Sequence, residues 1–265
     1  MRRRLDVELV RRGLFESRTR AVEAIDAGRV LVSGAPASTA ARRVDGGEAI
    51  ALLDAAGPAY VSRGGHKLEA ALDAFAVDPC GRTAVDVGSS TGGFTDCLLQ
   101  RGAAHVYAVD VGRGQLAWSL RGDPRVTVME RTNVRDVAPD ALDPRPDLCV
   151  ADLSFVSLAS VSPYLVALAT GDADFVLLVK PQYEAGRARV GRRGVVRDPA
   201  VHAAVLREVV AALDAAGLGV RAVVPSPLRG GDGNVEFLVH ARRGRASVAE
   251  SDLDAAVAAA PPAAR

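Results

Sequence analysis

From residue 83 onward, short apolar runs alternate with longer segments whose apolar residues recur at helical spacing. Such alternation is typical of α/β proteins, in which a parallel sheet is covered on both faces by the connecting helices. The pattern predicts helices at residues 94–100 and 199–216. The predicted strands are residues 83–87, 105–110, 125–129, 147–152, 174–180, 219–224 and 235–240. We therefore predict an α/β domain built on a parallel sheet.

The composition is that of a soluble globular protein, because 49% of the 265 residues are hydrophobic and 25% are charged. This excludes a disordered chain, a collagen-like fibre and a small disulfide-stapled domain. The three cysteines form no C-x-x-C pair, so we expect neither a metal site nor a disulfide framework. No apolar run approaches the ~18 residues that span a bilayer, and the first residues lack the apolar core of a signal peptide. We predict a cytoplasmic protein without a membrane segment.

The first part of the chain is more basic than the rest. Residues 1–67 hold 12 Lys and Arg against 8 Asp and Glu, whereas the remainder holds 21 against 24. A basic module on a mildly acidic body favours a polyanionic partner, although an arginine-rich helix can equally be a solvated surface. Breaks in the pattern divide the chain into a basic domain (1–57), a linker (58–64), a large domain (65–243) and a flexible tail (244–265).

Lysine is scarce in this chain. Of the 33 basic residues, only Lys67 and Lys180 are lysines. Arginine stays protonated in proteins, whereas a lysine amine can lose its proton and act as a base. The two lysines are therefore candidates for chemistry that arginine cannot perform.

The turn after the first predicted strand is rich in glycine, which lets a ligand approach the backbone and the N–H groups of the following helix. Its spacing differs from G-x-G-x-x-G, which disfavours a nicotinamide oxidoreductase, and from the P-loop of nucleoside-triphosphate sites. With an acidic residue ending the next strand, the turn resembles an S-adenosylmethionine pocket; the alternative is an ordinary tight turn. The predicted cofactor-binding residues are Asp86, Gly88, Ser89, Ser90, Thr91, Gly92, Gly93, Phe94, Asp110 for the ribose and Asn133 for the adenine.

Charged residues of both signs fall near the ends of predicted strands. Asp152 and Lys180 each end a strand, Glu236 lies on the last strand, and Lys67 precedes the first. Ligands of open α/β sheets bind beyond the carboxyl ends of the strands, so these residues can meet at one site. The alternative is two ordinary salt bridges, Lys180–Asp152 and Lys67–Glu236, which arginine would serve equally well.

Spaced residues of the basic domain form a further pattern, Arg4-Leu5-Asp6, Gly13-Leu14, Ser17-Arg18, Ala21, Ile25, Gly28-x-Val30-x-Val32 and Gly34. This pattern resembles the small RNA-binding domain named after ribosomal protein S4. The resemblance implies helices that present basic side chains to RNA phosphates, with Arg4 and Arg18 as the leading contacts and Arg20 and Arg11 as further ones. Phosphate contacts position an RNA rather than read its sequence.

The rest of the chain carries the motifs Tyr60-Val61-Ser62-Arg63-Gly64-Gly65-x-Lys67-Leu68, Asp86-Val87-Gly88-x-Ser90-x-Gly92-Gly93-Phe94-Thr95, Asp152-Leu153-Ser154-Phe155 and Lys180-Pro181-Gln182-Tyr183-Glu184. With the Lys-Asp-Lys-Glu set, they resemble the FtsJ-like ribose 2′-O-methyltransferases. Together with the basic domain, they resemble the TlyA family over nearly the whole chain. The resemblance implies a Rossmann-like S-adenosylmethionine-dependent methyltransferase sheet behind an S4-type domain. It also implies methylation of cytidine 2′-hydroxyls in ribosomal RNA, of the large subunit and in some members the small one.

A ribose hydroxyl must lose its proton as it attacks a methyl group, and Lys180 is the predicted catalytic base. A second ammonium at Lys67 would favour the neutral amine of Lys180, while Asp152 and Glu236 would orient both amines. Two rival functions remain: a non-catalytic protein that binds ribosomal RNA, and a membrane-lytic haemolysin, a label that members of the family also carry. The loop 181–198 could close over RNA phosphates or stay solvated; its arginines are Arg187, Arg189, Arg192, Arg193 and Arg197.

Overall fold

A computed structural model describes residues 2–26, 28–37, 39–52, 59–191, 194–230 and 233–260. The chain divides into two compact units, residues 1–59 and 60–265. The expected boundary at residues 55–58 lies outside the described residues. Residues 60–63, expected within the linker, belong to the second unit, because Tyr60 is buried and its ring packs against Gly65.

The first unit has a small hydrophobic core of its own, formed mainly by Leu5, Leu9, Ile25, Val30 and Val32. Leu5 and Leu9 share one helical face, as their spacing predicts. Its helices are α1 (Leu5–Arg11) and α2 (Arg18–Asp26). The strands form a three-stranded sheet, β3 (Ala35–Pro36), β2 (Val30–Val32) and β5 (Ile50–Leu52), and a pair, β1 (Arg3–Arg4) and β4 (Arg43–Val44).

The second unit is built on a seven-stranded sheet of order β11-β12-β10-β9-β6-β7-β8. Strands β6 to β10 pair in parallel, as predicted, but β12 runs antiparallel to both of its neighbours. The predicted parallel sheet is therefore confirmed for β6 to β10, but not for β11 and β12, which pair directly as consecutive antiparallel strands. The strands are β6 (Thr83–Val87), β7 (His105–Asp110), β8 (Val126–Glu130), β9 (Leu148–Ala151), β10 (Asp174–Val179), β11 (Leu218–Pro225) and β12 (Phe237–Arg243).

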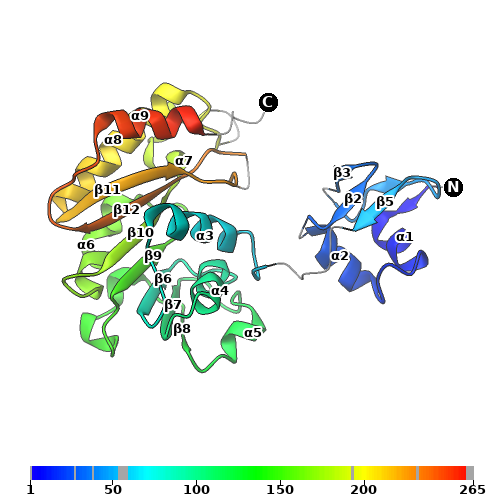
Figure 1. Ribbon diagram of the computed structural model, residues 1–265, viewed down its shortest axis with the longest axis horizontal. Coiled ribbons are helices and arrows are strands. Elements are labelled where there is room, and N and C mark those ends of the chain that lie inside the picture. The colour runs from blue at the N-terminus through cyan, green and yellow to red at the C-terminus, as the bar shows by residue number, and fades with distance from the viewer. Residues whose placement is uncertain are drawn as a thin grey trace. The chain divides into compact units, whose positions relative to one another are not determined.

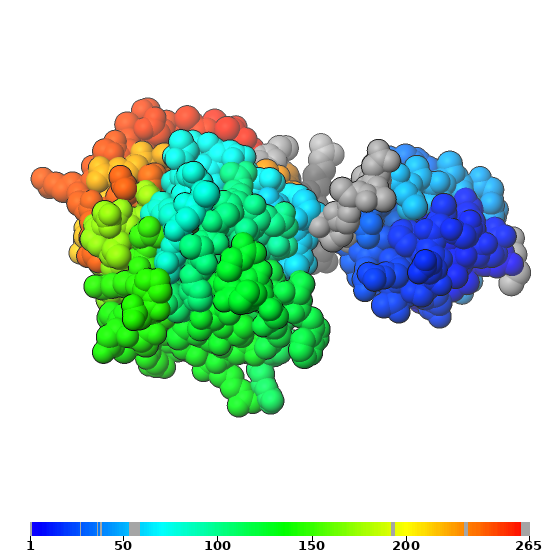
Figure 2. Space-filling view, turned by 60° about the horizontal axis from the view of Figure 1, so that its bottom comes forward, coloured from blue at the N-terminus to red at the C-terminus, as the bar shows by residue number. Residues whose placement is uncertain are grey.

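Helices cover both faces of this sheet (Figure 1). The helices are α3 (Gly64–Phe75), α4 (Gly93–Gln100), α5 (Trp118–Arg121), α6 (Leu158–Leu168), α7 (Pro181–Glu184), α8 (Pro199–Ala215) and α9 (Glu250–Ala259). Short 3-10 turns are η1 (Val134–Asp136), η2 (Pro139–Ala141) and η3 (Arg187–Arg189). The α3 segment, cyan in Figure 2, lies at the surface, as expected for a helix that covers the sheet from outside.

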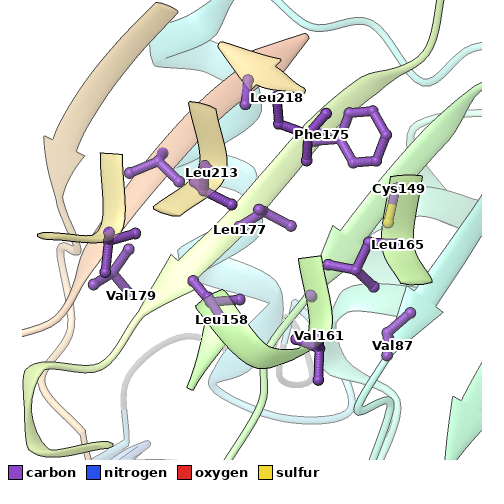
Figure 3. Close-up of a cluster of buried hydrophobic side chains, with 14 of the residues drawn as sticks. Val87, Cys149, Leu158, Val161, Leu165, Phe175, Leu177, Val179, Leu213 and Leu218 are labelled. Atoms are coloured by element: carbon purple, nitrogen blue, oxygen red, sulfur yellow. The ribbon is translucent and has the colours of Figure 1, made fainter. Parts of the chain in front are cut away.

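Side chains of the central strands alternate between two hydrophobic cores. On β10, Phe175, Leu177 and Val179 pack with α6 and α8 (Figure 3), whereas Val176 and Leu178 pack with α3 and α4. The period of two residues follows from the pleat of a strand. Because both faces of β10 are covered, the whole strand is buried, which explains why it is the most apolar run of the sequence.

The expected flexible tail at residues 244–265 is wrong for its central part. Residues 250–259 form α9, which lies against α8 and β11 (Figure 1). Leu253 and Ala256, three residues apart on one face of α9, are buried in the core that contains α6 and α8. Residues 261–265 lie outside the described residues. Among the residues described, no helix is long and apolar enough to cross a membrane.

Candidate active site

The site lies where the strand order of the sheet reverses. β6 and β9 are neighbours there, and their connections run to opposite sides of the sheet. Gly88 follows β6 with φ +85°, and a Cβ on it would lie 2.6 Å from the carbonyl oxygen of Asp152 after β9. Glycine is therefore required at position 88, because the two strand ends approach each other too closely for a side chain.

The glycine-rich turn packs tightly against its surroundings. A Cβ on Gly92, which has φ +96°, would lie 2.2 Å from Leu120 Cδ1, and one on Gly93 would lie 2.2 Å from Ser62 Oγ. Thr91 accepts a hydrogen bond from Ala117 N, and Ser89 is buried. Phe94, predicted to bind the cofactor, is buried in the core that α3 and α4 share, and so packs beneath the glycine-rich turn on the interior side.

Asp86 is the most unusual acid of the site, since it is fully buried on β6. Thr95 Oγ1 donates a hydrogen bond to Asp86 Oδ2 at 2.7 Å, but Oδ1 has no hydrogen-bond partner among the described residues. Burial raises the pKa of Asp86 to about 7, the charges of Asp152 and Asp110 act in the same direction, and the Thr95 hydrogen bonds oppose the shift. A buried acceptor without a partner beneath a glycine turn suits a ligand that carries an ammonium group.

Asp110 ties the β7 loop to this turn. Its Oδ2 accepts from Ser90 N at 2.8 Å and its Oδ1 from Gly112 N at 2.6 Å. Asn133, predicted to contact adenine, caps η1, because its Oδ1 accepts from Arg135 N at 3.1 Å. In this structure Asn133 thus has the role of a turn residue, which is common for an asparagine at the end of a strand.

Lys180 directly follows β10, next to the end of β9. Its Nζ lies 2.6 Å from Asp152 Oδ1 and donates a hydrogen bond to Ser154 Oγ at 3.0 Å. The contact with Asp152 is an ion pair without hydrogen-bond alignment, so the buried Oδ1 has no hydrogen-bond partner in the described part of the chain. Asp152 and Ser154 therefore hold the Lys180 amine in place at the carboxyl edge of the sheet.

The second lysine pair reaches the same edge of the sheet. Lys67, in the first turn of α3, donates to Glu236 Oε2 at 2.6 Å, and both side chains are buried. Val179 pairs with Phe237 in antiparallel register. That pair ends the ladder, so Lys180 and Glu236 each lie one residue beyond it at the same end of the two strands. Both salt bridges named as the alternative are present, and they lie at this edge of the sheet.

A pocket beside Lys180 was not foreseen from the sequence. It is lined by Phe155, Gln182, Tyr183, Gly186, Arg187 and Val190. The Phe155 side chain is 88% exposed, has a φ of +66° and lies with its ring centroid 5.1 Å from that of Tyr183. An exposed aromatic residue in a strained conformation suggests function rather than packing. The sequence does hold one indication of this pocket, because Phe155 and Tyr183 each lie three residues after a predicted catalytic residue.

In the first unit, the predicted RNA-binding arginines surround two buried acids. Arg4 and Arg18 both donate to Asp6, and the Arg18 Nη2 to Asp6 Oδ2 distance is 2.7 Å. Burial alone would raise the pKa of Asp6, but the hydrogen bonds from both arginines outweigh it and lower the pKa to about 2. Arg11 is held in the same way by Glu8.

These arginines keep a surface open to a partner. The exposed fractions of the Arg4, Arg11 and Arg18 side chains are 47%, 50% and 61%. Arg20 is 73% exposed, and its ion pair is with the exposed Glu23. The buried acids thus hold Arg4, Arg11 and Arg18 in fixed positions without covering them, as suits phosphate contacts. In the described part of the chain, there is no cluster of three or more His, Cys, Asp or Glu side chains that could bind a metal ion.

Comparison with known proteins agrees with these features. The profile of the FtsJ-like methyltransferases matches residues 60–243, and that of the S4 domain matches residues 3–50. The chain is 53% identical over 241 residues to the 16S/23S rRNA (cytidine-2′-O)-methyltransferase TlyA of Mycobacterium tuberculosis, covering 91% of this chain and 90% of that protein. It is 36% identical over 238 residues to Hemolysin A of Brachyspira hyodysenteriae, covering 89% and 98%. A solved structure from Streptococcus thermophilus, described as a hemolysin, has a TM-score of 0.77 and 39% identity over 97% of this chain and 94% of that one.

Proposed function

This chain belongs to the TlyA family of FtsJ-like methyltransferases, and we propose that it methylates the 2′-hydroxyl of a cytidine in ribosomal RNA with S-adenosylmethionine as methyl donor. The observation that carries the proposal is the pair of lysine–carboxylate contacts at the carboxyl edge of the sheet. They adjoin a glycine turn on one side and an aromatic pocket on the other. A ribosomal RNA substrate places the enzyme in the cytoplasm.

The fit of S-adenosylmethionine rests on the turn after β6. Asp86 Oδ1 offers a buried acceptor for an ammonium group, and the glycines at positions 88, 92 and 93 let a ligand approach the backbone. The Asp110 carboxylate is placed beside the turn, where it can accept from ribose hydroxyls. When bound, S-adenosylmethionine supplies an electrophilic methyl group.

Lys180 is the proposed base for the ribose hydroxyl. The proton of the 2′-hydroxyl passes to the Lys180 amine as the new oxygen–carbon bond forms and the sulfur–carbon bond of the methyl donor breaks. Asp152, 2.6 Å from Lys180 Nζ, stabilises the ammonium that results. Glu236 and Lys67 form a buried ion pair at the same edge of the sheet and contribute to the electrostatic surroundings of the amine. Much of the remaining rate enhancement comes from aligning the oxygen with the methyl group.

The pocket next to Lys180 suits the base of the target nucleotide. A nucleotide that presents its 2′-hydroxyl to Lys180 must leave its stack, and an exposed aromatic ring can then take the place of the lost neighbour. Phe155 and Tyr183 offer such rings, and Arg187 supplies a positive charge at the pocket wall. The arginines on Asp6 and Glu8 in the S4 domain are the proposed phosphate contacts.

Methyl transfer from radiolabelled S-adenosylmethionine to unmodified ribosomal subunits tests this proposal. We expect labelled RNA that resists alkaline cleavage at one phosphodiester bond, because that cleavage needs a free 2′-hydroxyl. Lys180→Arg should keep the melting temperature and the affinity for S-adenosylmethionine but lose activity by on the order of 100-fold or more. Lys67→Arg, which can keep its ion pair with Glu236, should lose less.

Two outcomes would contradict the proposal. A fully active Lys180→Arg variant would rule out the base. Absence of label from both unmodified subunits, in spite of bound S-adenosylmethionine, would favour a protein that binds ribosomal RNA without modifying it.

The description of relatives as hemolysins favours a second candidate, a membrane-lytic activity. It makes a separate prediction, which is that the purified protein releases dye from liposomes. We expect no release at concentrations where methylation is complete, and release by both the wild type and Lys180→Arg would support the lytic function.

A further inference from the structure

The segment between α7 and α8 is bound to its neighbours at several residues. Arg189 pairs with Glu208 of α8 at 2.7 Å, and Val196 has backbone contacts to two buried side chains. Its N–H donates a hydrogen bond to Asn234 Oδ1 at 2.9 Å, and its carbonyl oxygen lies 3.1 Å from His202 Nε2. Asn234 Nδ2 also donates to the carbonyl oxygen of Gly194 at 3.0 Å. Thus an amide before β12 and an imidazole on α8 bind the backbone of the segment from two sides.

These contacts are built into the interior of the domain. Asn234 is 1% exposed, His202 is 3% exposed and Val196 is 1% exposed. Burial lowers the pKa of His202, so its imidazole is neutral at physiological pH, and a carbonyl partner requires the proton on Nε2. Both polar atoms of the Asn234 amide are used, so an aspartate at position 234 would lack the donor for Gly194.

The anchored segment forms part of the pocket beside Lys180. Gly186, Arg187 and Val190 line that pocket, and Val196 lies at the end of the same segment. Asn234 also precedes Glu236 by two residues, so one short stretch of chain bears both the anchor of the pocket wall and the acid that binds Lys67.

We propose that Asn234 and His202 are positioning residues for the RNA substrate, because they fix residues 194–196, which follow the wall of the target-nucleotide pocket at Gly186, Arg187 and Val190. Neither side chain contacts the reacting atoms. Their effect is on the affinity for RNA rather than on the transfer step. This inference rests on the proposed ribose methylation.

The kinetic test compares Asn234→Asp and His202→Leu with the wild type. We expect KM for ribosomal subunits to rise on the order of tenfold, the equivalent of one lost hydrogen bond. We expect kcat and the dissociation constant of S-adenosylmethionine to change less than about twofold. His202→Gln, which retains a donor for the Val196 carbonyl, should restore most of the affinity even if His202→Leu folds poorly. His105→Leu is the matched control, because His105 begins β7, which is separated from β12 by β10, β9 and β6 in the sheet.

A second measurement does not depend on methylation. Trypsin cleaves after arginine, and the segment contains Arg187 and Arg189. We expect faster cleavage there in Asn234→Asp and His202→Leu than in the wild type, His202→Gln or His105→Leu. Unchanged cleavage, or a loss of kcat without a rise in KM, would overturn the inference. If the wild type methylates no ribosomal substrate, the proposed function fails, and the cleavage rates alone decide whether Asn234 and His202 hold the segment.

Discussion

At the scale of single residues, the surroundings of two buried aspartates shift their pKa values in opposite directions. Asp86 has one hydroxyl donor and two carboxylates nearby, so burial dominates and the pKa rises to about 7. Asp6 is also buried, but two guanidinium groups and the Val7 N–H donate to it, and its pKa falls to about 2. The number of donors around a buried carboxyl group therefore decides the direction of the shift.

The raised pKa of Asp86 predicts a pH-dependent stability. The folded state retains the Asp86 proton up to about pH 7, whereas the unfolded chain loses it near the ordinary value of 3.8. The stabilising contribution is complete below that ordinary pKa and is lost as the pH rises through the folded value. Asp86→Asn removes this dependence, so its stability relative to the wild type should increase between pH 4 and pH 8 by up to about 4 kcal/mol.

Urea unfolding at a series of pH values measures the effect. Asp110→Asn, which changes a carboxylate that accepts from two backbone N–H groups, serves as the comparison. Parallel pH profiles for wild type and Asp86→Asn would mean that Asp86 ionises normally in the folded protein.

At the scale of elements, α9 shows how weak local signals can still yield a packed helix. Residues 250–259 are rich in alanine and carry only a narrow apolar face, formed by Leu253 and Ala256. That face is buried against α8 and β11, and Arg207 on α8 also binds Glu250 and Asp254 of α9. The helix is therefore stabilised by its neighbours more than by its own sequence.

Leu253→Ala tests whether α9 belongs to the core. We expect a loss of about 2–5 kcal/mol in the free energy of unfolding, the range for truncating a well-buried leucine side chain to alanine. Ser251→Ala, an exposed position of the same helix, should change stability by less than about 0.5 kcal/mol. Equal effects of the two substitutions in urea unfolding would indicate that α9 does not pack on the domain.

At the scale of the whole molecule, the chain has two units with separate cores. The S4 unit has the core around Leu5 and Leu9, and the methyltransferase unit has the cores on the two faces of its sheet. Linking two binding modules raises the affinity for a substrate that contacts both, without any new contact at the catalytic site.

Removal of the S4 unit should therefore separate RNA affinity from cofactor affinity. We expect residues 60–265 alone to bind S-adenosylmethionine within about twofold of the full chain, but to show a KM for ribosomal subunits raised by about tenfold or more. Arg20→Ala in the full chain should raise KM less, since it removes one exposed cation and keeps the arginines on Asp6 and Glu8. Calorimetric titration and initial rates provide the measurements, and an unchanged KM for residues 60–265 would show that the S4 unit does not contribute to binding.

The local pattern of the sequence was enough to predict the strands of the large sheet and the helices α4 and α8, but not α3, α6 or α9. β10, for example, is a continuous apolar run from Phe175 to Val179 because both faces of the strand are buried. Gly88 and the acids at strand ends can also be recognised locally, from their place directly after a predicted strand. They meet at one site because parallel strands end at a common edge. The candidate site residues could therefore be predicted from their positions along the chain.

Contacts between distant parts of the chain decided the rest. The antiparallel pairing of β12 with β10 brings Glu236, just before β12, to the same edge as Lys180, just after β10, and no local pattern encodes which strands become neighbours. The burial of α9 and the exposure of Phe155 likewise depend on which surfaces lie nearby. The sequence by itself determined the elements and the chemistry at their ends, since these depend on neighbouring residues. Tertiary structure decided the partner of each charge and the shape of the pocket, because these depend on packing between segments that lie far apart in the chain.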